Sequence, residues 1–321
     1  MSLDKLSSRA IIGQFYKKLN AADGMEWINA VSNYFISDQD SETYAWLGQS
    51  PVMREWVGGR QAKGFTTNGL TIENKHFEAT IDIPLKHLRR DKTGQVKVRI
   101  NELATRTNSH WAQLLSKLIK NGESTVCYDG SYFFDTTHSE ENSGTQSNSI
   151  TFDLTTAGIN GEVGTPELPT EVALRQAILK GIQQIIGFKD DQGEPMNENA
   201  NRFLVMVPTN LWFVAKSCLA VPLTVGGASN PVKVLSDLDI AVASNPRLNW
   251  EDKIVIFRTD SEVKALIRQE EEQVQIKAKA EGSEYEFDHD AHQYGVDTWR
   301  NVGFGYWQNA CLVKLTQTSK D

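Results

Sequence analysis

The amino-acid sequence predicts an α+β protein. Segments with apolar residues at three- and four-residue steps, typical of helices, are interspersed with segments in which apolar and polar residues alternate, typical of strands. The two kinds of segment follow no regular strand–helix–strand repeat, which favours α+β over a doubly wound parallel sheet. The 321 residues, of which 40% are hydrophobic, suffice for one large domain or two ordinary ones.

Composition excludes several classes of protein. The net charge of −8 argues against a protein whose main task is to bind nucleic-acid backbones, because such binding needs a cationic face. Cys127, Cys218 and Cys311 are far apart and form no CxxC pair, which predicts neither a disulfide framework nor a zinc ribbon. No apolar run approaches the roughly 20 residues of a membrane span, and the opening "MSLDKLSSRA" lacks the pattern of a signal peptide, so we expect no export.

The first 57 residues are loosely organised. Helical spacing predicts one helix over residues 11–19 and a second over residues 27–35. A polar run at residues 37–42 follows, and "YAWLGQSPVMREWVGGR" then brings back large apolar side chains. Two interpretations fit equally: an arm that lies across another surface, and a small subdomain with its own core.

Alternation begins at Leu70. In "LTIENKHFEATIDIP", residues 70–84, apolar residues stand two apart, which predicts two strands joined by a bend at "ENK". Because an isolated hairpin is only marginally stable in water, this one needs a surface to lie on, and another subunit could supply it.

The remaining elements follow from local signals. A long helix is expected over residues 96–122 with Gly122 at its C-cap, and a second after a Thr170 cap as far as residue 186. Thr209 or Asn210 is expected to cap a helix that ends at residue 220. The stretches "RFLVMVP", "KIVIF", "EQVQIKAKA" and "GYWQNACLVKL" predict strands.

The stretch "TVCYDGSYFFDTTH", residues 125–138, has the residue types of an active site. Cys127 with His138 could form a nucleophile and base, and Cys127, Asp129, Asp135 and His138 could bind a metal. Neither set matches a known functional spacing, and aromatic residues alternate with these side chains as packing residues do. We therefore favour a structural turn, in which Asp129 and Gly130 make the bend and Asp135 and His138 satisfy backbone groups.

Two further motifs are weaker. "DHDAH", residues 288–292, could bind a cation but is more typical of a solvated loop. "VGFGYW" contains a GxG pattern that leads into an aromatic strand rather than a helix, so we expect no phosphate cradle.

The blocks "YAWLGQSPVMREWVGGR", "LTIENKHFEATIDIP", "LLSKLIKNG" and "CYDGSYFFDTTH" stand in the order and spacing of the major head subunit family of Mu-like phages, which the sequence resembles from about Tyr44 to its end. Two later blocks, "GFKDDQGEPMNENANRFLVMVPTNLWFVAKSCL" and "YGVDTWRNVGFGYWQNACLVK", are shared more loosely with other tailed-phage capsid proteins. One departure is "LRRDKTG", which stands where the family tends to have an acidic pair.

The resemblance implies the tailed-phage major capsid fold. Residues 1–57 would be the N-terminal arm, 58–95 the extended β-hairpin loop and its base, 96–124 the spine helix of the peripheral domain, 125–265 the axial domain, and 266–321 a return to the peripheral domain. The implied function is that of a major capsid protein, which self-assembles into the icosahedral head around double-stranded DNA, without enzyme activity or cofactor. The 125–138 block is then structural.

The resemblance also implies partners. The protein would form hexamers and pentamers with itself and be assembled in the bacterial host cytoplasm into the virion, with no membrane association. Because arm-like sequence starts within the first few residues, we expect a scaffolding protein to act in trans. A portal is expected, decoration proteins could join, and packaged DNA would be contacted only non-specifically. The alternatives are an enzyme that uses Cys127 and His138, and a filament or surface-layer protein.

Charge is unevenly distributed. Residues 86–106 hold seven Lys or Arg against two acidic residues, a balance of +5, whereas residues 269–290 hold eight acidic residues against two lysines, a balance of −6. Two interpretations fit equally well: solvated faces, and surfaces that meet across a subunit boundary. The second predicts the intersubunit contacts Lys86, Arg89, Arg90 and Lys92 with Glu270, Glu271 and Glu272.

Overall fold

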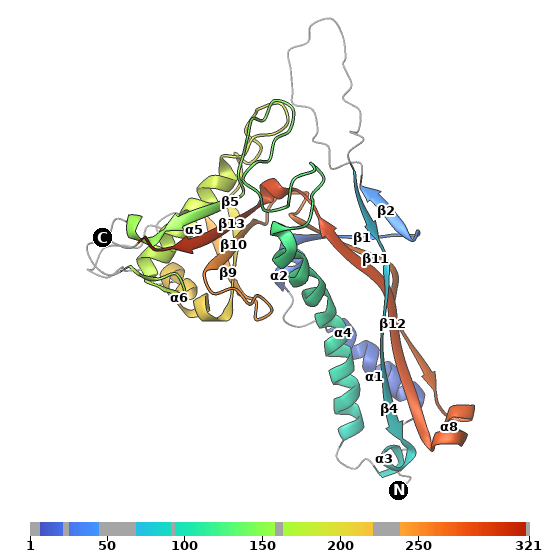
Figure 1. Ribbon diagram of the computed structural model, residues 1–321. Helices are drawn as coiled ribbons and strands as arrows, with labels where there is room; N and C mark the ends of the chain where they lie inside the picture. Colours follow the sequence, from blue (N-terminus) through green and yellow to red (C-terminus); the bar gives the residue numbers. More distant parts are fainter. Residues whose placement is uncertain are drawn as a thin grey trace, which may run out of the picture.

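Two sheets organise the chain in the computed structural model, which describes residues 7–21, 26–44, 69–90, 94–157, 163–220 and 238–318. One sheet has the strand order β1-β11-β12-β4 and runs along a long, narrow part of the molecule, and the other has the order β5-β13-β10-β8-β9 (Figure 1). We call these parts the elongated module and the five-stranded module.

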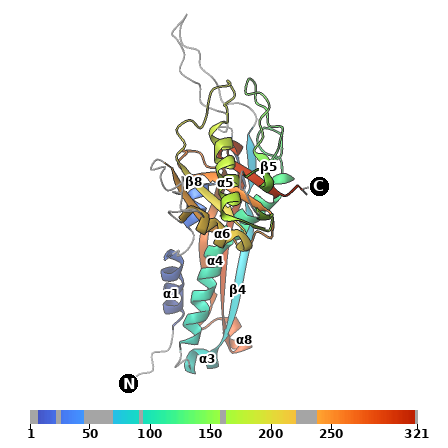
Figure 2. The same ribbon diagram turned by 90° about the vertical axis from the view of Figure 1, so that its left-hand side faces the viewer.

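The elongated module combines four strands with helices from both ends of the chain. Its strands are β1 (Ser32–Ile36), β4 (Lys75–Pro84), β11 (Leu266–Lys279) and β12 (Ala291–Phe304), and its helices are α1 (Ser8–Asn20), α2 (Glu26–Val31), α3 (Leu85–Arg90), α4 (Gln95–Lys120) and α8 (Glu284–His289). β11 and β12 form a long antiparallel hairpin with α8 at its tip, and β4 pairs with the other edge of β12 (Figures 1 and 2). α1 and the N-terminal half of α4 pack with these strands around Phe15, Ile100 and Tyr294.

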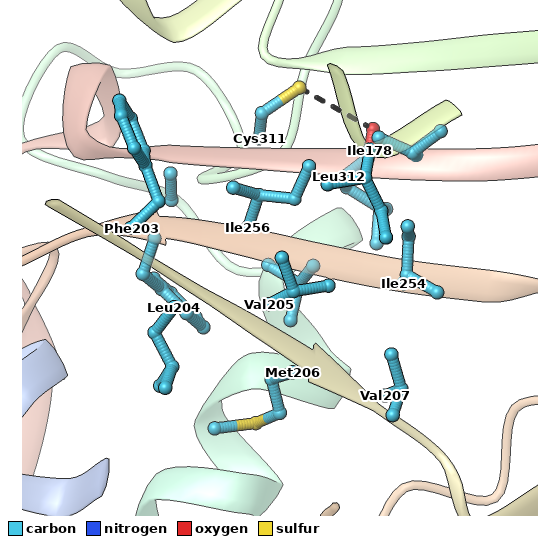
Figure 3. Close-up of a cluster of buried hydrophobic side chains, with 14 of the residues drawn as sticks. Ile178, Phe203, Leu204, Val205, Met206, Val207, Ile254, Ile256, Cys311 and Leu312 are labelled. Carbon is cyan, nitrogen blue, oxygen red and sulfur yellow. Dashed lines mark hydrogen bonds between the residues drawn. The ribbon is translucent and has the colours of Figure 1, made fainter. Parts of the chain in front are cut away.

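The five-stranded module contains the larger core. Its strands are β5 (Ser149–Asp153), β8 (Arg202–Val207), β9 (Asp239–Ser244), β10 (Lys253–Arg258) and β13 (Ala310–Thr316), and its helices are α5 (Glu171–Ile186) and α6 (Thr209–Ala220). Apolar residues fill both faces of the central strands, so β8 and β10 read as continuous apolar runs (Figure 3). The short pairs β2 (Ser41–Tyr44) with β3 (Leu70–Glu73) and β6 (Gly164–Thr165) with β7 (Leu168–Pro169) complete the strands, and the 3-10 turns are η2 (Asn121–Glu123), η3 (Leu154–Thr156) and η4 (Trp307–Asn309).

Helix α4 links the two cores. Its 26 residues span about 39 Å at the usual rise of an α-helix. Val96, Ile100 and Leu103 lie in the core of the elongated module, and Leu115 and Ile119 lie in the larger core. At its end, Glu123 bonds Lys253 of β10 (2.6 Å) and Lys314 of β13 (2.7 Å). Burial alone would raise the pKa of Glu123, but the two ammonium groups outweigh it and hold the pKa below its usual value.

Several helices lie close to their predicted positions. α1, α4 and α5 agree with the expected segments, and the Thr170 hydroxyl accepts a hydrogen bond from the Ala173 amide as an N-cap. The helix after Pro208 begins at Thr209, and the Asn210 side chain donates to the Glu167 and Glu251 carbonyls instead of capping it. α4 ends two residues before Gly122, which packs against Phe134. The strand expected from residue 305 begins at Ala310, after η4.

The predicted second helix over residues 27–35 is wrong in its second half. α2 ends at Val31, and β1 follows as a strand that pairs in parallel with β11. The spacing of Tyr34 and Phe35 fits a helix, but backbone pairing with β11 decides the conformation.

The predicted hairpin over residues 70–84 is also wrong. β3 and β4 follow one another with only Asn74 between them and pair with different strands: β3 with β2, and β4 with β12. The shift of apolar positions from even to odd numbers marks this change of partner rather than a reversal of the chain. Asn74 is buried, donates to the Gln39 carbonyl (2.8 Å) and accepts from Gln269 (2.9 Å). Residues 45–68, which lie between β2 and β3, are outside the described residues.

The prediction that residues 266–321 return together to the domain of the long helix is wrong for one strand. β11 and β12 lie in the elongated module, but β13 lies between β5 and β10 in the other sheet. No helix in the described ranges is both long and apolar enough to cross a membrane.

Candidate assembly surfaces

The 125–138 block forms a buried turn that leads from α4 to β5. The turn bends at Gly130, which has a φ of +86°, and the Asp129 carboxylate accepts the amide of Ser131 (3.1 Å). His138 is fully buried between two partners: its Nδ1 lies 2.6 Å from Asp129 Oδ2 and its Nε2 lies 3.2 Å from Asn148 Oδ1. The imidazole stacks on the indole of Trp307, with 4.0 Å between ring centroids. Asp129 and Gly130 therefore make the bend, as predicted. His138 also stabilises the turn, but its ring bonds two side chains and not the backbone groups that were predicted.

Two residues that the sequence did not single out complete this network. The Asn148 amide donates to the carbonyls of Phe133 (2.7 Å) and Trp307 (3.3 Å), and its oxygen accepts from the Asp135 amide (2.9 Å). Glu140 accepts hydrogen bonds from Tyr128, Trp307 and Gln308, and burial raises the pKa of its carboxyl group. Nothing in the polar stretch "SEENSGTQSNS" marks these two residues, because their role depends on segments distant in the chain.

The geometry does not support chemistry at this turn. Cys127 is buried, and its thiol points at the carbonyl of Gly305 (3.8 Å). Burial, with the nearby Asp129 charge, raises the pKa of this thiol well above its usual value, so the reactive thiolate is disfavoured. Asp135 uses one carboxylate oxygen to accept the amides of Thr136 and Thr137. Within the described ranges, no three His, Cys, Asp or Glu side chains gather in a group that could hold a metal ion.

The "DHDAH" segment forms the end of α8 and the start of β12. Asp290 ends the helix in the left-handed conformation, and the buried His292 lies 3.2 Å from Glu286. The GxG pattern lies at the end of β12, where the amide of Gly305 donates to the Ala265 carbonyl (2.8 Å).

The predicted basic contacts lie on α3 and beyond it. Leu85 and Leu88 bury one side of this helix, which leaves Lys86 and Arg89 exposed. The side chain of Arg90 and all of Lys92 lie outside the described residues.

The predicted acidic contacts divide into three cases. Glu270 is only 7% exposed and bonds Tyr34 and Thr298 of its own chain, with Arg300 at 3.8 Å, so its prediction as an intersubunit contact is wrong. Glu271 lines a recess of about 470 Å³ with residues 38–41. Glu272 is exposed at an irregularity in the pairing of β11 with β12.

The two charged windows meet at one end of the elongated module. The amide of Leu85 on α3 donates to the carbonyl of Asp290 (2.8 Å), and the Tyr285 hydroxyl on α8 donates to Asp82 on β4 (2.6 Å). Figure 1 shows α3 and α8 together at the end of the module farthest from the five-stranded sheet. The basic and acidic surfaces are thus neighbours within one subunit.

Large apolar side chains are exposed at separate places on the surface. Phe287 on α8 is 90% exposed, and Phe213 on α6 is 74% exposed, with Trp212 and Leu168 also exposed. Val98 on α4 and Ile36 on β1 are exposed as well. Single exposed apolar residues are common on protein surfaces, so these positions alone do not mark an interface.

A profile of the Mu-like prophage major head subunit gpT family matches residues 7–157 and 239–321. The chain belongs to this family. The match includes the buried turn, both strands of the long hairpin and the central strand β13, so it extends over both modules.

Two curated relatives agree with this assignment. A segment of 116 residues is 34% identical to the "Major capsid protein" of Escherichia phage Mu, and one of 98 residues is 37% identical to the "Mu-like prophage FluMu major head subunit" of Haemophilus influenzae. The two matched segments cover 36% and 30% of this chain. They span only about a third of the relatives' own lengths, 38% of the phage Mu protein and 32% of the FluMu protein.

Solved phage capsids share the fold of this family member. A chain in the procapsid of bacteriophage JBD30 matches with a TM-score of 0.54 and 22% identity over 98% of this chain and 76% of that one. A chain of the JBD30 capsid matches with a TM-score of 0.52 and 16% identity over 91% of this chain and 65% of that one. A chain of the capsid of cyanophage P-SCSP1u matches with a TM-score of 0.54 and 11% identity over 90% of this chain and 87% of that one. The predicted fold class, the α+β tailed-phage major capsid fold, is therefore confirmed, and both the family and the fold are those of structural proteins.

Proposed function

We propose that the protein is the major capsid subunit of a Mu-like phage or prophage, and that copies of it assemble into the shell of the phage head. The observation that carries this proposal is the family match over residues 7–157 and 239–321.

The shape of the subunit suits such an assembly. An elongated module with a long helix and a long hairpin exposes more surface for its volume than a sphere does, and this surface is available for contacts with neighbours (Figures 1 and 2). A closed shell repeats each contact many times, so individually modest contacts add up while errors stay reversible. The buried polar turn at residues 125–148 then serves to fix the two modules rather than to catalyse a reaction.

The finer assignments belong to the same proposal. The elongated module would be the peripheral domain with α4 as its spine, and the five-stranded module the axial domain. Residues 1–57 would be the N-terminal arm, and residues 58–95 would hold the extended loop and its base. The subunits would form hexamers and pentamers in the host cytoplasm, with a scaffolding protein in trans, a portal, and decoration proteins if the shell uses them. Contact with packaged DNA would be non-specific, since the chain carries a net charge of −8.

Electron microscopy combined with sedimentation tests this function. We expect the purified protein, alone or with a scaffolding protein from the same phage, to form rings or closed shells. Extended filaments or flat sheets would favour a filament or surface-layer protein. A chain that stays monomeric at high concentration, with the scaffold present, would contradict a capsid role.

A further inference from the structure

We propose that Phe287 of one subunit inserts into the groove between β4 and α4 of a second copy of this chain. The proposal rests on the proposed capsid function and names one contact of the assembly. Three observations support it: the presentation of Phe287, the shape of the groove, and the charges around both.

Helix α8 holds Phe287 out into solvent on a fixed support. The hydroxyl of Ser283 caps the helix by accepting the Glu286 amide. The hydroxyl of Tyr285 bonds Asp82 of β4 (2.6 Å), and Glu286 bonds the Gly282 amide (2.6 Å) and lies 3.2 Å from His292 Nε2. These contacts anchor the helix to both neighbouring strands, while the ring of Phe287 stays 90% exposed. A rigidly presented aromatic side chain loses little conformational entropy when a partner covers it.

The groove offers an apolar floor on the same module. It has a volume of about 770 Å³, which is in the range of pockets that bury a whole drug-sized molecule and is therefore ample for one Phe side chain. Its apolar lining includes Ile81 and Ile83 of β4 with Val96 and Leu103 of α4, and Ala79 lines it as well.

Charge complements shape at this contact. Phe287 is flanked by the exposed carboxylates of Glu284 and Asp288. The groove is lined by Arg99, Arg106 and His87, and also by the acidic residues Asp82 and Glu102. Tyr285 bonds Asp82 within the same subunit. Arg106 pairs with Glu102 (2.8 Å), whereas Arg99 is exposed and forms no ion pair with any residue that the structure describes. Arg99 can therefore receive a carboxylate from α8 of the neighbouring subunit.

A subunit cannot make this contact with itself. Along β4, Ile81 and Ile83 point towards α4, whereas Asp82 between them points to the opposite face, where Tyr285 of α8 bonds it. Figure 1 likewise shows α4 and α8 on opposite sides of β4 and β12. Phe287 is also 90% exposed, so its ring does not occupy the groove of its own subunit. The contact is therefore one between two copies of the chain.

Site-specific crosslinking in assembled particles tests the contact. The natural cysteines Cys127, Cys218 and Cys311 are all buried, so a short bismaleimide should react mainly with introduced thiols. Asp288→Cys places a thiol beside Phe287, and Ala79→Cys places one in the groove. We expect a mixture of these two single variants to give crosslinked dimers in particles. Asp288→Cys mixed with Leu168→Cys, an exposed position of the five-stranded module, is the control and should give none.

Variants of Phe287 then measure its role. In the Asp288→Cys chain, Phe287→Ser should lower the crosslinked fraction at least about tenfold, because burial of a Phe side chain changes a binding constant by that factor or more. Phe287→Leu keeps an apolar group and should lower it less than about threefold. Normal particles without the Asp288–Ala79 crosslink, or a yield indifferent to Phe287→Ser, would overturn the contact and leave the capsid function standing. A wild-type chain that forms no particles would overturn both.

Discussion

Both ring nitrogens of His138 are engaged inside the fold, by Asp129 and by Asn148. A general base needs a nitrogen that can reach a substrate or a nucleophile, and the Cys127 thiol points at the backbone carbonyl of Gly305 instead. The imidazole therefore acts as a cross-link between the turn at residue 129 and the chain at residue 148. Its stacking on Trp307 extends the cross-link to the turn before β13.

We expect His138→Ala to lower the free energy of unfolding more than Cys127→Ala does. His138→Ala would leave the Asp129 carboxylate buried without its main partner, so we expect the free energy of unfolding to fall by about 2–4 kcal/mol. Cys127→Ala loses only a sulfur atom and should lower it by about 1 kcal/mol. Denaturant unfolding followed by circular dichroism measures both. Equal effects, or loss of a hydrolytic activity in a folded variant, would contradict the structural role.

His110 should make the fold sensitive to mild acid. Burial, with the charges of Arg300 and Arg247, lowers its pKa to about 4. Its Nδ1 also accepts a hydrogen bond from Arg300 Nε (3.1 Å), which requires the neutral ring. The unfolded chain takes up a proton below about pH 6.5 while the folded chain does not until about pH 4, so stability is lost as the pH falls through this window.

Because His110 is partly exposed, we expect the loss between pH 7 and pH 5 from this residue to be no more than about 1 kcal/mol. The comparison of wild type with His110→Asn, which does not titrate, isolates this contribution in thermal unfolding at both pH values. Wild type should lose more stability than the variant on acidification. A variant that loses as much would show that other groups cause the acid sensitivity.

Helix α5 lies closer to its sheet than a side chain at its middle would allow. A Cβ added at Gly181 would meet Ile256 Cδ1 at 2.4 Å and Val313 Cγ2 at 2.9 Å. The missing side chain at this position is therefore what lets α5 pack on β10 and β13.

Two Gly→Ala substitutions should have opposite effects. Gly181→Ala should lower the free energy of unfolding by about 1–3 kcal/mol because it overpacks the core. Gly13→Ala on α1 meets nothing within 4 Å and should raise it by about 0.5–1 kcal/mol, because alanine favours a helix. Chemical denaturation of both variants checks the pair. Stabilisation by Gly181→Ala would mean that α5 can move away from the sheet at little cost.

At the scale of elements, the sequence predicted what local spacing determines and missed what partners determine. The apolar stripes of α4 and α5 contain enough repeats to fix both helices to within about two residues. The alternation along residues 70–84 correctly predicted that β3 and β4 are strands. It could not predict their partner strands, because a two-residue period shows only which face of a strand is buried. β1 was missed because its conformation depends on pairing with β11, far along the chain. The exposure of Phe287 and the burial of Glu270 also follow only from the assembled sheet.

The described part of the molecule has two main cores, and helix α4 contributes residues to both. The smaller core holds α1, β4 and the first half of α4, and the larger core holds the five-stranded sheet with α5, α6 and the end of α4. Leu266 of β11 and Phe304 of β12 also lie in the larger core, so the near ends of these strands belong with the five-stranded module. We expect the rest of the elongated module, around α1 and β4, to open without unfolding the five-stranded module.

Hydrogen exchange on a core variant of each module tests this independence. Ile100→Ala and Ile178→Ala each remove a fully buried side chain and should each cost about 2–4 kcal/mol. Ile100→Ala should speed amide exchange in α1 and β4 and leave β10 protected, whereas Ile178→Ala should act first on β10 and β13. Uniform acceleration in both modules for either variant would show a single cooperative unit.

The position of β13 has a consequence for biosynthesis. A ribosome delivers residues 310–316 after every other described strand, yet this strand lies between β5 and β10. Until it emerges, β5 lacks its strand partner and one edge of β10 is open, so the sheet cannot close around its core. A nascent or prematurely terminated chain that stops before Ala310 therefore cannot present the finished surface of the five-stranded module to a growing assembly. The topology itself keeps incomplete polypeptides out of the particle.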